Sequence, residues 1–348
     1  MLVFALLSDL PAALVNRRRK SKFSRSLLIA LATRALETSL DMLNPISAIH
    51  RREGLSDARR LILALLTFIV WSATSRTLPA QEKSLLWRVS RDDKSVHLLG
   101  SIHYLRKENY PLNPAILTAL DASTRLILEI DLNSTSPQSA HRLTLEKAVY
   151  QNGTTLEQNV SGETYLLAAR RATELGLDRR ILNPMKPWFA ALTMVAIKLQ
   201  RVGLDPNFGV DRHLAERAKS SGKPTGGLET LEFQLGIFDR LSQREQELML
   251  RETVDRLERL DRDIDAIVST WLKGESNQLS SLLHAGMQKY PELYETIVVE
   301  RNRRWLGDIE KLIQEGSGAM IVVGAAHLVG KDSVVEMLKA KGYSVEQR

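Results

Sequence analysis

The chain has 348 residues, of which 44% are hydrophobic and 26% are charged, and these proportions exclude a disordered or fibrous protein. Its formal net charge of +7 comes from residues 1–80, which carry 12 basic and 5 acidic side chains, whereas the remaining residues carry 36 of each. The body of the chain is therefore neutral and indicates no nucleic-acid partner, and the absence of cysteine excludes disulfides, thiolate nucleophiles and thiolate metal ligands.

Residues 42–80 have the layout of a secretory signal peptide. The apolar run Leu61–Trp71 follows Arg59 and Arg60 and precedes small and polar residues that end at Ala80. This run is about half of the roughly 20 residues that a transmembrane helix needs, which favours a cleaved signal over an uncleaved membrane anchor. A buried helix of the folded protein is the third alternative.

Residues 1–41 are predicted to be a mis-assigned or disordered extension. A signal normally begins close to the amino terminus, and Met42 is a more natural start than Met1. Residues 81–348 then form the mature domain. We expect a protein exported to the periplasm or cell envelope, which associates with the membrane only if the amino-terminal segment is retained.

The mature domain opens with the features of an α/β layer. Two short β-type runs, Leu85–Val89 and Val96–Gly100, are separated by turn-like residues and predict a hairpin. A loop and a helix over Ala115–Ser123 follow, and the apolar run Arg125–Leu132 predicts a buried strand. This order of strand, loop, helix and strand is typical of an α/β layer.

The middle of the domain, residues 138–300, is predicted to be helical. Within it, Gln243–Leu272 repeats Leu, Val and Ile at intervals of three and four residues, which predicts one long amphipathic helix with a solvated charged surface. A helix over Glu300–Gly316 and a buried strand leading into a glycine loop, Ala319–Gly330, follow. We therefore predict a mixed α/β (α+β) fold with a central sheet surrounded by helices.

Two loops share one pattern: a strand, a glycine, two small or apolar residues and a histidine. They are Gly100–His103 and Gly324–His327. Glycine at the carboxyl end of a buried strand lets the backbone turn sharply, and open α/β sheets bind ligands beyond those ends. Two imidazoles and a carboxylate often bind a divalent metal, and Glu129 in the buried strand supplies a carboxylate. Structural, hydrogen-bonded histidines are the alternative.

These loops and several further motifs resemble those of the TraB/GumN family and occur in the same order along the chain. This family is related to the PrgY pheromone-shutdown proteins and to the Tiki metalloproteases. The resemblance covers roughly residues 85–346. Its motifs are Gly100–His103, Glu129–Asp131, Lys186–Trp188, Gly209–Asp211, Gly227–Thr230 with Gln234, Glu300–Asn302 with Trp305, and Gly324–His327.

The resemblance implies a metal-dependent hydrolase of the peptidase type. His103, His327 and Glu129 would bind the metal, which we expect to be Mn²⁺, Co²⁺ or Zn²⁺. Glu129 is alternatively the general base. Arg301 would hold a substrate carboxylate or a developing oxyanion, because its cationic fork is suited to both.

Asn302, Asp211 and Glu229 are second-rank catalytic candidates, and helix capping or buried ion pairing is the alternative for each. The expected partner is a peptide or another substrate in the cell envelope. Because fold kinship does not fix activity, the alternative function is an envelope protein that binds a peptide or glycan without turnover.

Overall fold

The computed structural model describes residues 83–131, 134 and 136–348. The proposed extension, 1–41, and the proposed signal peptide or anchor, 42–80, lie outside these residues and stay predictions. The described residues all belong to one compact unit. Within them, no helix combines the length and the apolar character that crossing a lipid bilayer would require.

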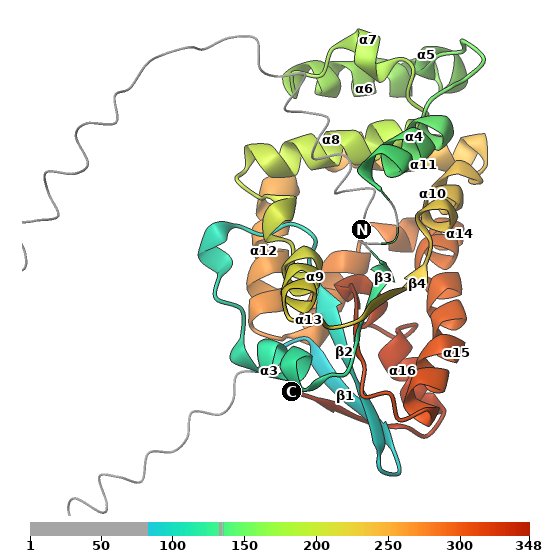
Figure 1. The fold of residues 1–348 in the computed structure, drawn as a ribbon. Helices are drawn as coiled ribbons and strands as arrows, with labels where there is room; N and C mark the ends of the chain where they lie inside the picture. Colours follow the sequence, from blue (N-terminus) through green and yellow to red (C-terminus); the bar gives the residue numbers. More distant parts are fainter. Residues whose placement is uncertain (1–82, 132–133, 135) are drawn as a thin grey trace, which may run out of the picture. The chain divides into compact units, whose positions relative to one another are not determined.

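A six-stranded mixed sheet forms the centre of the described part, with the order β4-β3-β5-β2-β1-β6 (Figure 1). Neighbours from β4 to β2 are parallel, whereas β1 is antiparallel to both β2 and β6. The strands are β1 (Leu86–Arg91), β2 (Lys94–Ser101), β3 (Leu126–Ile130), β4 (Thr225–Glu229), β5 (Met320–Gly324) and β6 (Ser344–Gln347). The predicted central sheet and its opening hairpin are confirmed.

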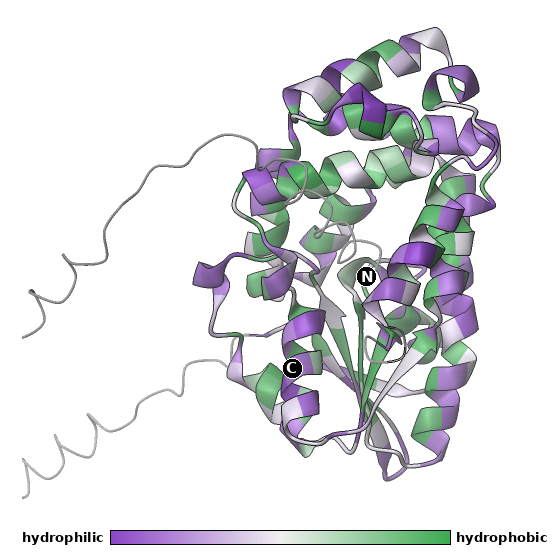
Figure 2. Ribbon diagram, turned by 45° about the horizontal axis from the view of Figure 1, so that its top comes forward, coloured by the Kyte–Doolittle hydropathy of each residue, from purple (hydrophilic) through white to green (hydrophobic). Residues whose placement is uncertain are grey.

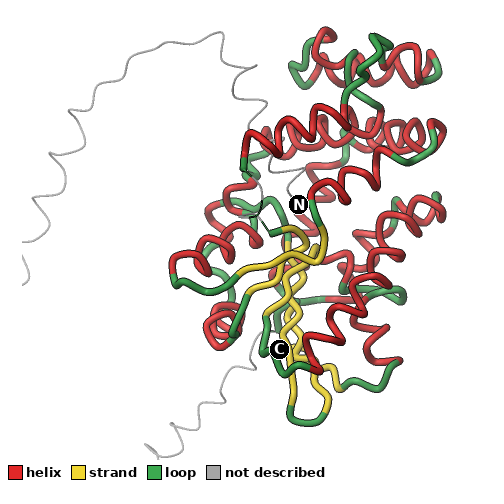
Figure 3. Tube along the Cα trace, turned by 45° about the vertical axis from the view of Figure 1, so that its right-hand side comes forward, coloured by secondary structure: helices red, strands yellow, loops and turns green. Residues whose placement is uncertain are grey.

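Helices cover both sides of the sheet, and further helices lie beyond the carboxyl ends of its parallel strands (Figures 1 and 3). On the sheet itself, α15 packs against β2, while α9 packs against β3 and β4. The α-helices are α3 (Pro114–Ala122), α4 (Pro137–Ala148), α5 (Leu156–Asn159), α6 (Gly162–Glu174), α7 (Arg179–Leu182), α8 (Pro187–Arg201), α9 (Val210–Ser220), α10 (Leu231–Asp239), α11 (Gln243–Arg256), α12 (Leu260–Leu272), α13 (Ser276–His284), α14 (Pro291–Tyr294), α15 (Glu300–Gln314) and α16 (Val334–Ala340).

Short turns of other helix types connect these elements. The 3-10 turns are η1 (Lys107–Asn109), η2 (Pro206–Phe208), η3 (Met287–Lys289) and η5 (Ala325–His327), and η4 (Glu295–Val299) is a π-helical turn. The η4 turn runs directly into α15, and η5 directly follows β5. The η4 turn thus directly precedes the motif Glu300–Asn302, and η5 lies within the motif Gly324–His327.

The hydrophobic core follows the strands and the inner faces of the helices. Leu98 and Leu99 in β2 and Ile321 and Val322 in β5 are fully buried, as expected for strands covered on both faces. Figure 2 shows hydrophobic residues on the strands, and polar residues along the outward faces of several helices. The sheet is therefore a rigid support for the loops at its carboxyl edge.

Two features of the middle region differ from the prediction. The expected single helix over Gln243–Leu272 is two helices, because α11 packs against α6 and α8 whereas α12 packs against α13. The break falls at Leu257–Arg259, which contains neither glycine nor proline, so tertiary packing sets it. The region also contains β4, whose Gly226 and Gly227 hide the usual strand pattern.

Candidate functional site

The sheet brings the two Gly-x-x-His loops and Glu129 to one edge. Strands β2 and β5 are parallel neighbours with Ser101 opposite Gly324, so both loops leave the sheet side by side. Strand β3, which carries Glu129, pairs with the other side of β5. A Cβ built on Gly324 would lie 3.2 Å from Glu129 Oε1, 3.5 Å from His103 Nε2 and 3.7 Å from His327 Cδ2. The three predicted ligands therefore converge on Gly324, where an added side-chain carbon would contact all three.

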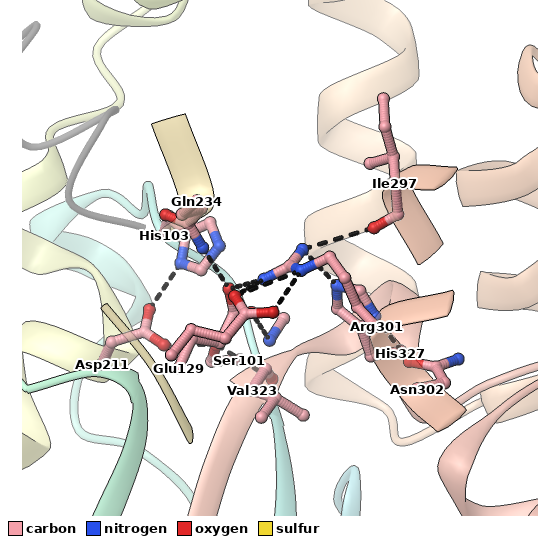
Figure 4. Close-up of polar contacts among 12 residues, drawn as sticks. Ser101, His103, Glu129, Asp211, Gln234, Ile297, Arg301, Asn302, Val323 and His327 are labelled. Atoms are coloured by element: carbon pink, nitrogen blue, oxygen red, sulfur yellow. Dashed lines mark hydrogen bonds and ion pairs between the residues drawn. The ribbon is translucent and has the colours of Figure 1, made fainter. Parts of the chain in front are cut away.

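His103 is oriented by Asp211. The Nδ1 atom of His103 lies 2.7 Å from Asp211 Oδ2, and Ser101 Oγ donates to Asp211 Oδ1 at 2.6 Å (Figure 4). Because a carboxylate only accepts hydrogen bonds, the neutral ring has its proton on Nδ1 and its lone pair on Nε2. The His103 side chain is 24% exposed and that of Asp211 only 3%. His103 is thus the member of the cluster that solvent reaches most easily.

The start of α9 places Asp211 beside the first loop. Val210 N donates to Ile102 O at 3.0 Å, and a Cβ on Gly209 would collide with the backbone carbonyl of His103. Glycine therefore allows the helix to begin against the loop. Asp211 lies in the first turn of α9, where the helix dipole favours a carboxylate.

His327 is held in one tautomer by Asn302. Asn302 Nδ2 donates to Asp332 O at 2.8 Å, which turns its Oδ1 toward His327 Nδ1 at 2.7 Å. Nδ1 therefore carries the proton, and Nε2 accepts from Arg301 Nη1 at 3.0 Å. Burial, with the nearby Arg301 guanidinium, lowers the pKa of His327 to about 3, so the ring is neutral.

Glu129 is a buried carboxylate whose oxygens accept three hydrogen bonds. Gly324 N donates to Oε1 at 2.7 Å, while Gln234 Nε2 and Arg301 Nη2 donate to Oε2 at 3.0 and 2.8 Å. Burial alone would raise the pKa of Glu129, but the Arg301 guanidinium holds it well below its usual range. Glu129 is therefore ionised.

Arg301 links Glu129 to a second carboxylate. Its Nε donates to Glu229 Oε1 at 3.0 Å and its Nη2 donates to Glu229 Oε2 at 2.7 Å, which is a bidentate pair. Although burial acts to lower it, the two glutamates raise the pKa of Arg301 above its ordinary value. The η4 turn precedes Arg301, and Nη1 also lies 3.4 Å from the carbonyl of Ile297 in that turn.

Side chains from α12 and α13 hold the two loops from outside the cluster. Trp271 Nε1 donates to the carbonyl of Gly100 at 2.7 Å, and His284 Nε2 donates to the carbonyl of Ala326 at 3.1 Å. Both side chains are largely buried. The loop backbones are therefore fixed before any ligand arrives.

Sequence comparison with known proteins identifies the family of this chain. Residues 85–347 match the sequence profile of the TraB/PrgY/gumN family. The chain belongs to this family. It is 26% identical over 270 residues to the uncharacterized protein YbaP of Escherichia coli (strain K12), a match that covers 77% of this chain and 92% of the relative.

Two further relatives of this TraB/PrgY/gumN chain are more distant. A metalloprotease TIKI homolog of Amphimedon queenslandica is 26% identical over 340 residues, which covers 82% of this chain and 66% of that protein. An uncharacterized protein of Treponema pallidum (strain Nichols) is 20% identical over 281 residues, covering 76% and 83%. No solved structure matches the chain significantly.

All seven site residues inferred from the TraB/GumN motifs lie in or beside this cluster. Sequence reasoning missed the role of Ser101, which is inside the first loop motif and bonds Asp211. It also named Gln234 and Trp305 only as motif positions. Gln234 bonds Glu129, and the Trp305 ring lies 4.5 Å from that of His327. Their fixed places in the family motifs were the only available signal.

The cluster suits a divalent metal in the type of its donor atoms. Both imidazoles direct their protonated Nδ1 at a fixed acceptor, the arrangement common around metal-binding histidines, and Glu129 is ionised. Their present placement is different. Among the described residues, no three His, Asp or Glu side chains surround a common point at metal-binding distance. His327 Nε2 instead faces Arg301.

A pocket of about 220 Å³ adjoins Arg301 on the side of α10. Its lining includes Phe233, Arg240, Glu300 and Arg304, with the Arg304 guanidinium 4.1 Å above the centre of the Phe233 ring. The volume is below the roughly 300 to 1,000 Å³ of typical small-molecule sites. The pocket is therefore large enough for only part of an extended substrate.

Proposed function

We propose that this TraB/PrgY/gumN chain is a metal-dependent hydrolase that cleaves peptide bonds, with His103, His327 and Glu129 at its centre. The observation that carries the proposal is their convergence on Gly324 from three neighbouring strands. The relative named a metalloprotease TIKI homolog adds support for this reaction class. We propose Mn²⁺, Co²⁺ or Zn²⁺ as the cofactor.

The residues that would hold the ion are His103 and His327 through Nε2, and Glu129 through a carboxylate oxygen. When bound, the metal would polarise the scissile carbonyl or lower the pKa of a water molecule. Each imidazole already has the tautomer that this role needs, because Asp211 and Asn302 accept from Nδ1.

The other polar groups have roles that follow from their contacts. Asp211 fixes the ring of His103, so that Nε2 points toward Gly324. Arg301 stabilises the negative charge of Glu129, and Glu229 holds Arg301 in turn. Solvent reaches the cluster at His103, and the adjoining pocket lies beside Arg301. We infer that substrate approaches from the solvent-exposed edge of His103.

We also propose that the protein works outside the cytoplasm, because residues 42–80 have the layout of a signal peptide. The substrate would then be a peptide of the cell envelope. Cell fractionation with amino-terminal sequencing tests this part. A chain that begins near residue 81 in the envelope fraction supports it, and a full-length chain confined to the cytoplasm counts against it.

The hydrolase proposal is tested by turnover of peptide libraries with Mn²⁺, Co²⁺ or Zn²⁺ added. We expect metal-dependent products from the wild type, and a loss of at least about 100-fold for His103→Ala and His327→Ala, as for other groups essential to the reaction. His141→Ala, an exposed histidine in α4, is the matched control. Binding of envelope peptides or glycans without any product would favour the alternative, a binding protein.

A further inference from the structure

Arg301 already supplies a positive charge at the centre of the cluster. Its Nη2 donates to Glu129 Oε2 at 2.8 Å, and its Nη1 donates to His327 Nε2 at 3.0 Å. Both acceptors are proposed metal ligands. An imidazole binds a metal through its lone pair, at roughly 2.0–2.1 Å for Zn²⁺. The lone pair of His327 Nε2 therefore cannot serve the guanidinium and an ion together.

Arg301 also binds Glu229, a carboxylate that is not one of the proposed metal ligands. Glu229, at the end of β4, accepts from Nε at 3.0 Å and from Nη2 at 2.7 Å. Its side chain is only 1% exposed, so the pair is shielded from water. Because this contact is bidentate, Arg301 can release Glu129 and His327 and still keep a carboxylate partner.

The charge of the cluster leaves room for a second cation. In the described part of the chain, two buried carboxylates, those of Glu129 and Glu229, share the buried Arg301 guanidinium, and a third, that of Asp211, contacts Ser101 and His103. By formal charge, the three carboxylates and Arg301 together carry two excess negative charges. Buried charge that lacks a partner is costly. A divalent ion would balance this excess with Arg301 still in place on Glu229.

We propose that Arg301 and a divalent metal ion are alternative partners of Glu129 and His327, and that the metal binds when the guanidinium withdraws onto Glu229. The inference rests on the proposed function for the identity of the metal ligands. Arg301 then lowers the affinity for metal while it stabilises the metal-free protein. Glu229 raises that affinity without binding the ion.

The test is isothermal titration calorimetry of the metal-free full chain with MnCl₂, CoCl₂ or ZnCl₂. We expect Arg301→Gln to bind metal about tenfold more tightly than the wild type, because the competing cation is gone. We expect Glu229→Gln to bind about tenfold more weakly, since Arg301 then stays on Glu129. Both figures are at the lower end of the effects of residues that contact metal ligands. Arg303→Gln, an exposed arginine in the same helix, changes the charge equally and should leave the affinity unchanged.

Opposite directions for the two variants distinguish this proposal from a merely structural role, which would weaken binding in both. Unchanged or weaker binding by a folded Arg301→Gln overturns it. If circular dichroism shows that this variant does not fold, Glu229→Gln decides, and an affinity equal to the wild type overturns the proposal. The expected order of affinities without any peptide turnover would refute the hydrolase function and leave this inference standing. An absence of metal binding in every variant overturns both.

Discussion

His327 Nδ1 lies 2.7 Å from the Oδ1 of Asn302, and this contact decides which ring nitrogen faces Arg301. The orientation of the amide is itself fixed, because Asn302 Nδ2 donates to the carbonyl of Asp332. The tautomer of His327 therefore depends on one fully buried side chain.

Replacing this side chain should affect both stability and activity. We expect Asn302→Ala to lose about 1–3 kcal/mol of unfolding free energy, because it leaves the Nδ1–H of His327 and the Asp332 carbonyl unpaired. Metal affinity or kcat/KM should fall about 10–100-fold. Urea denaturation and steady-state kinetics measure these effects. Asn207→Ala, at an exposed position, is the control, and equal behaviour of the two variants would refute the role of Asn302.

We expect Asp211 to affect metal binding and activity through its contact with His103, and not to affect the fold. In Asp211→Asn an amide replaces the carboxylate that accepts from both Ser101 Oγ and His103 Nδ1. We expect a loss of about 10–100-fold in metal affinity or kcat/KM with the circular dichroism spectrum unchanged. Ser101→Ala should cost less, because the carboxylate remains. Wild-type activity of Asp211→Asn would show that His103 needs no such partner.

We expect glycine to be essential at position 209, because the backbone of His103 leaves no room for a side chain there. A Cβ there would collide with the carbonyl of His103, so Gly209→Ala should push α9 away from the loop and abolish most activity. Gly307→Ala is the matched control. No atom other than those of its chain neighbours and its own helix backbone lies within 4 Å of its Cβ position, and alanine in a helix should add about 0.5–1 kcal/mol of stability. Thermal unfolding and turnover compare the two, and an active Gly209→Ala protein would contradict the expected displacement.

The neutral state of His327 predicts how stability depends on pH. Its pKa is lowered to about 3 in the folded chain, against about 6.5 in an unfolded one. This difference stabilises the fold fully above about pH 6.5, and the benefit is lost as the pH falls toward about 3. We therefore expect the wild type to lose its stability advantage over His327→Gln between about pH 7 and pH 4. Urea unfolding in EDTA measures the difference at each pH, and a constant difference would argue against a buried neutral ring.

The meeting of the two loops was predictable from the sequence because it depends only on neighbouring strands. A strand followed by Gly-x-x-His occurs twice, and the parallel pairing of β2 with β5 brings both loops to one edge. The contact of Arg301 with Glu129 was not predictable, since the residues are 172 positions apart and the contact depends on side-chain torsions. Charge patterns alone do not show that Arg301 has two glutamates as partners.

The middle of the chain was the least predictable part. Strand β4 was missed because Gly226 and Gly227 lack the β-branched side chains that mark strands. A Cβ on Gly227 would lie 2.6 Å from Asp131 N, so glycine is required by the close approach of the neighbouring backbone. The prediction of one long helix was wrong for a similar reason, because no residue in that stretch signals the break after Arg256.

The π-helical turn Glu295–Val299 sets the rotation of α14 relative to α15, the helix that carries Arg301 and Asn302. Such a turn contains one residue more than regular α-helical winding, and each residue rotates the helix by about 100°. Removing any one of these five residues would turn α14 about the axis of α15 by that angle. Homologous chains that retain Arg301 and Asn302 should therefore conserve the number of residues in this turn more strictly than the identities of those residues.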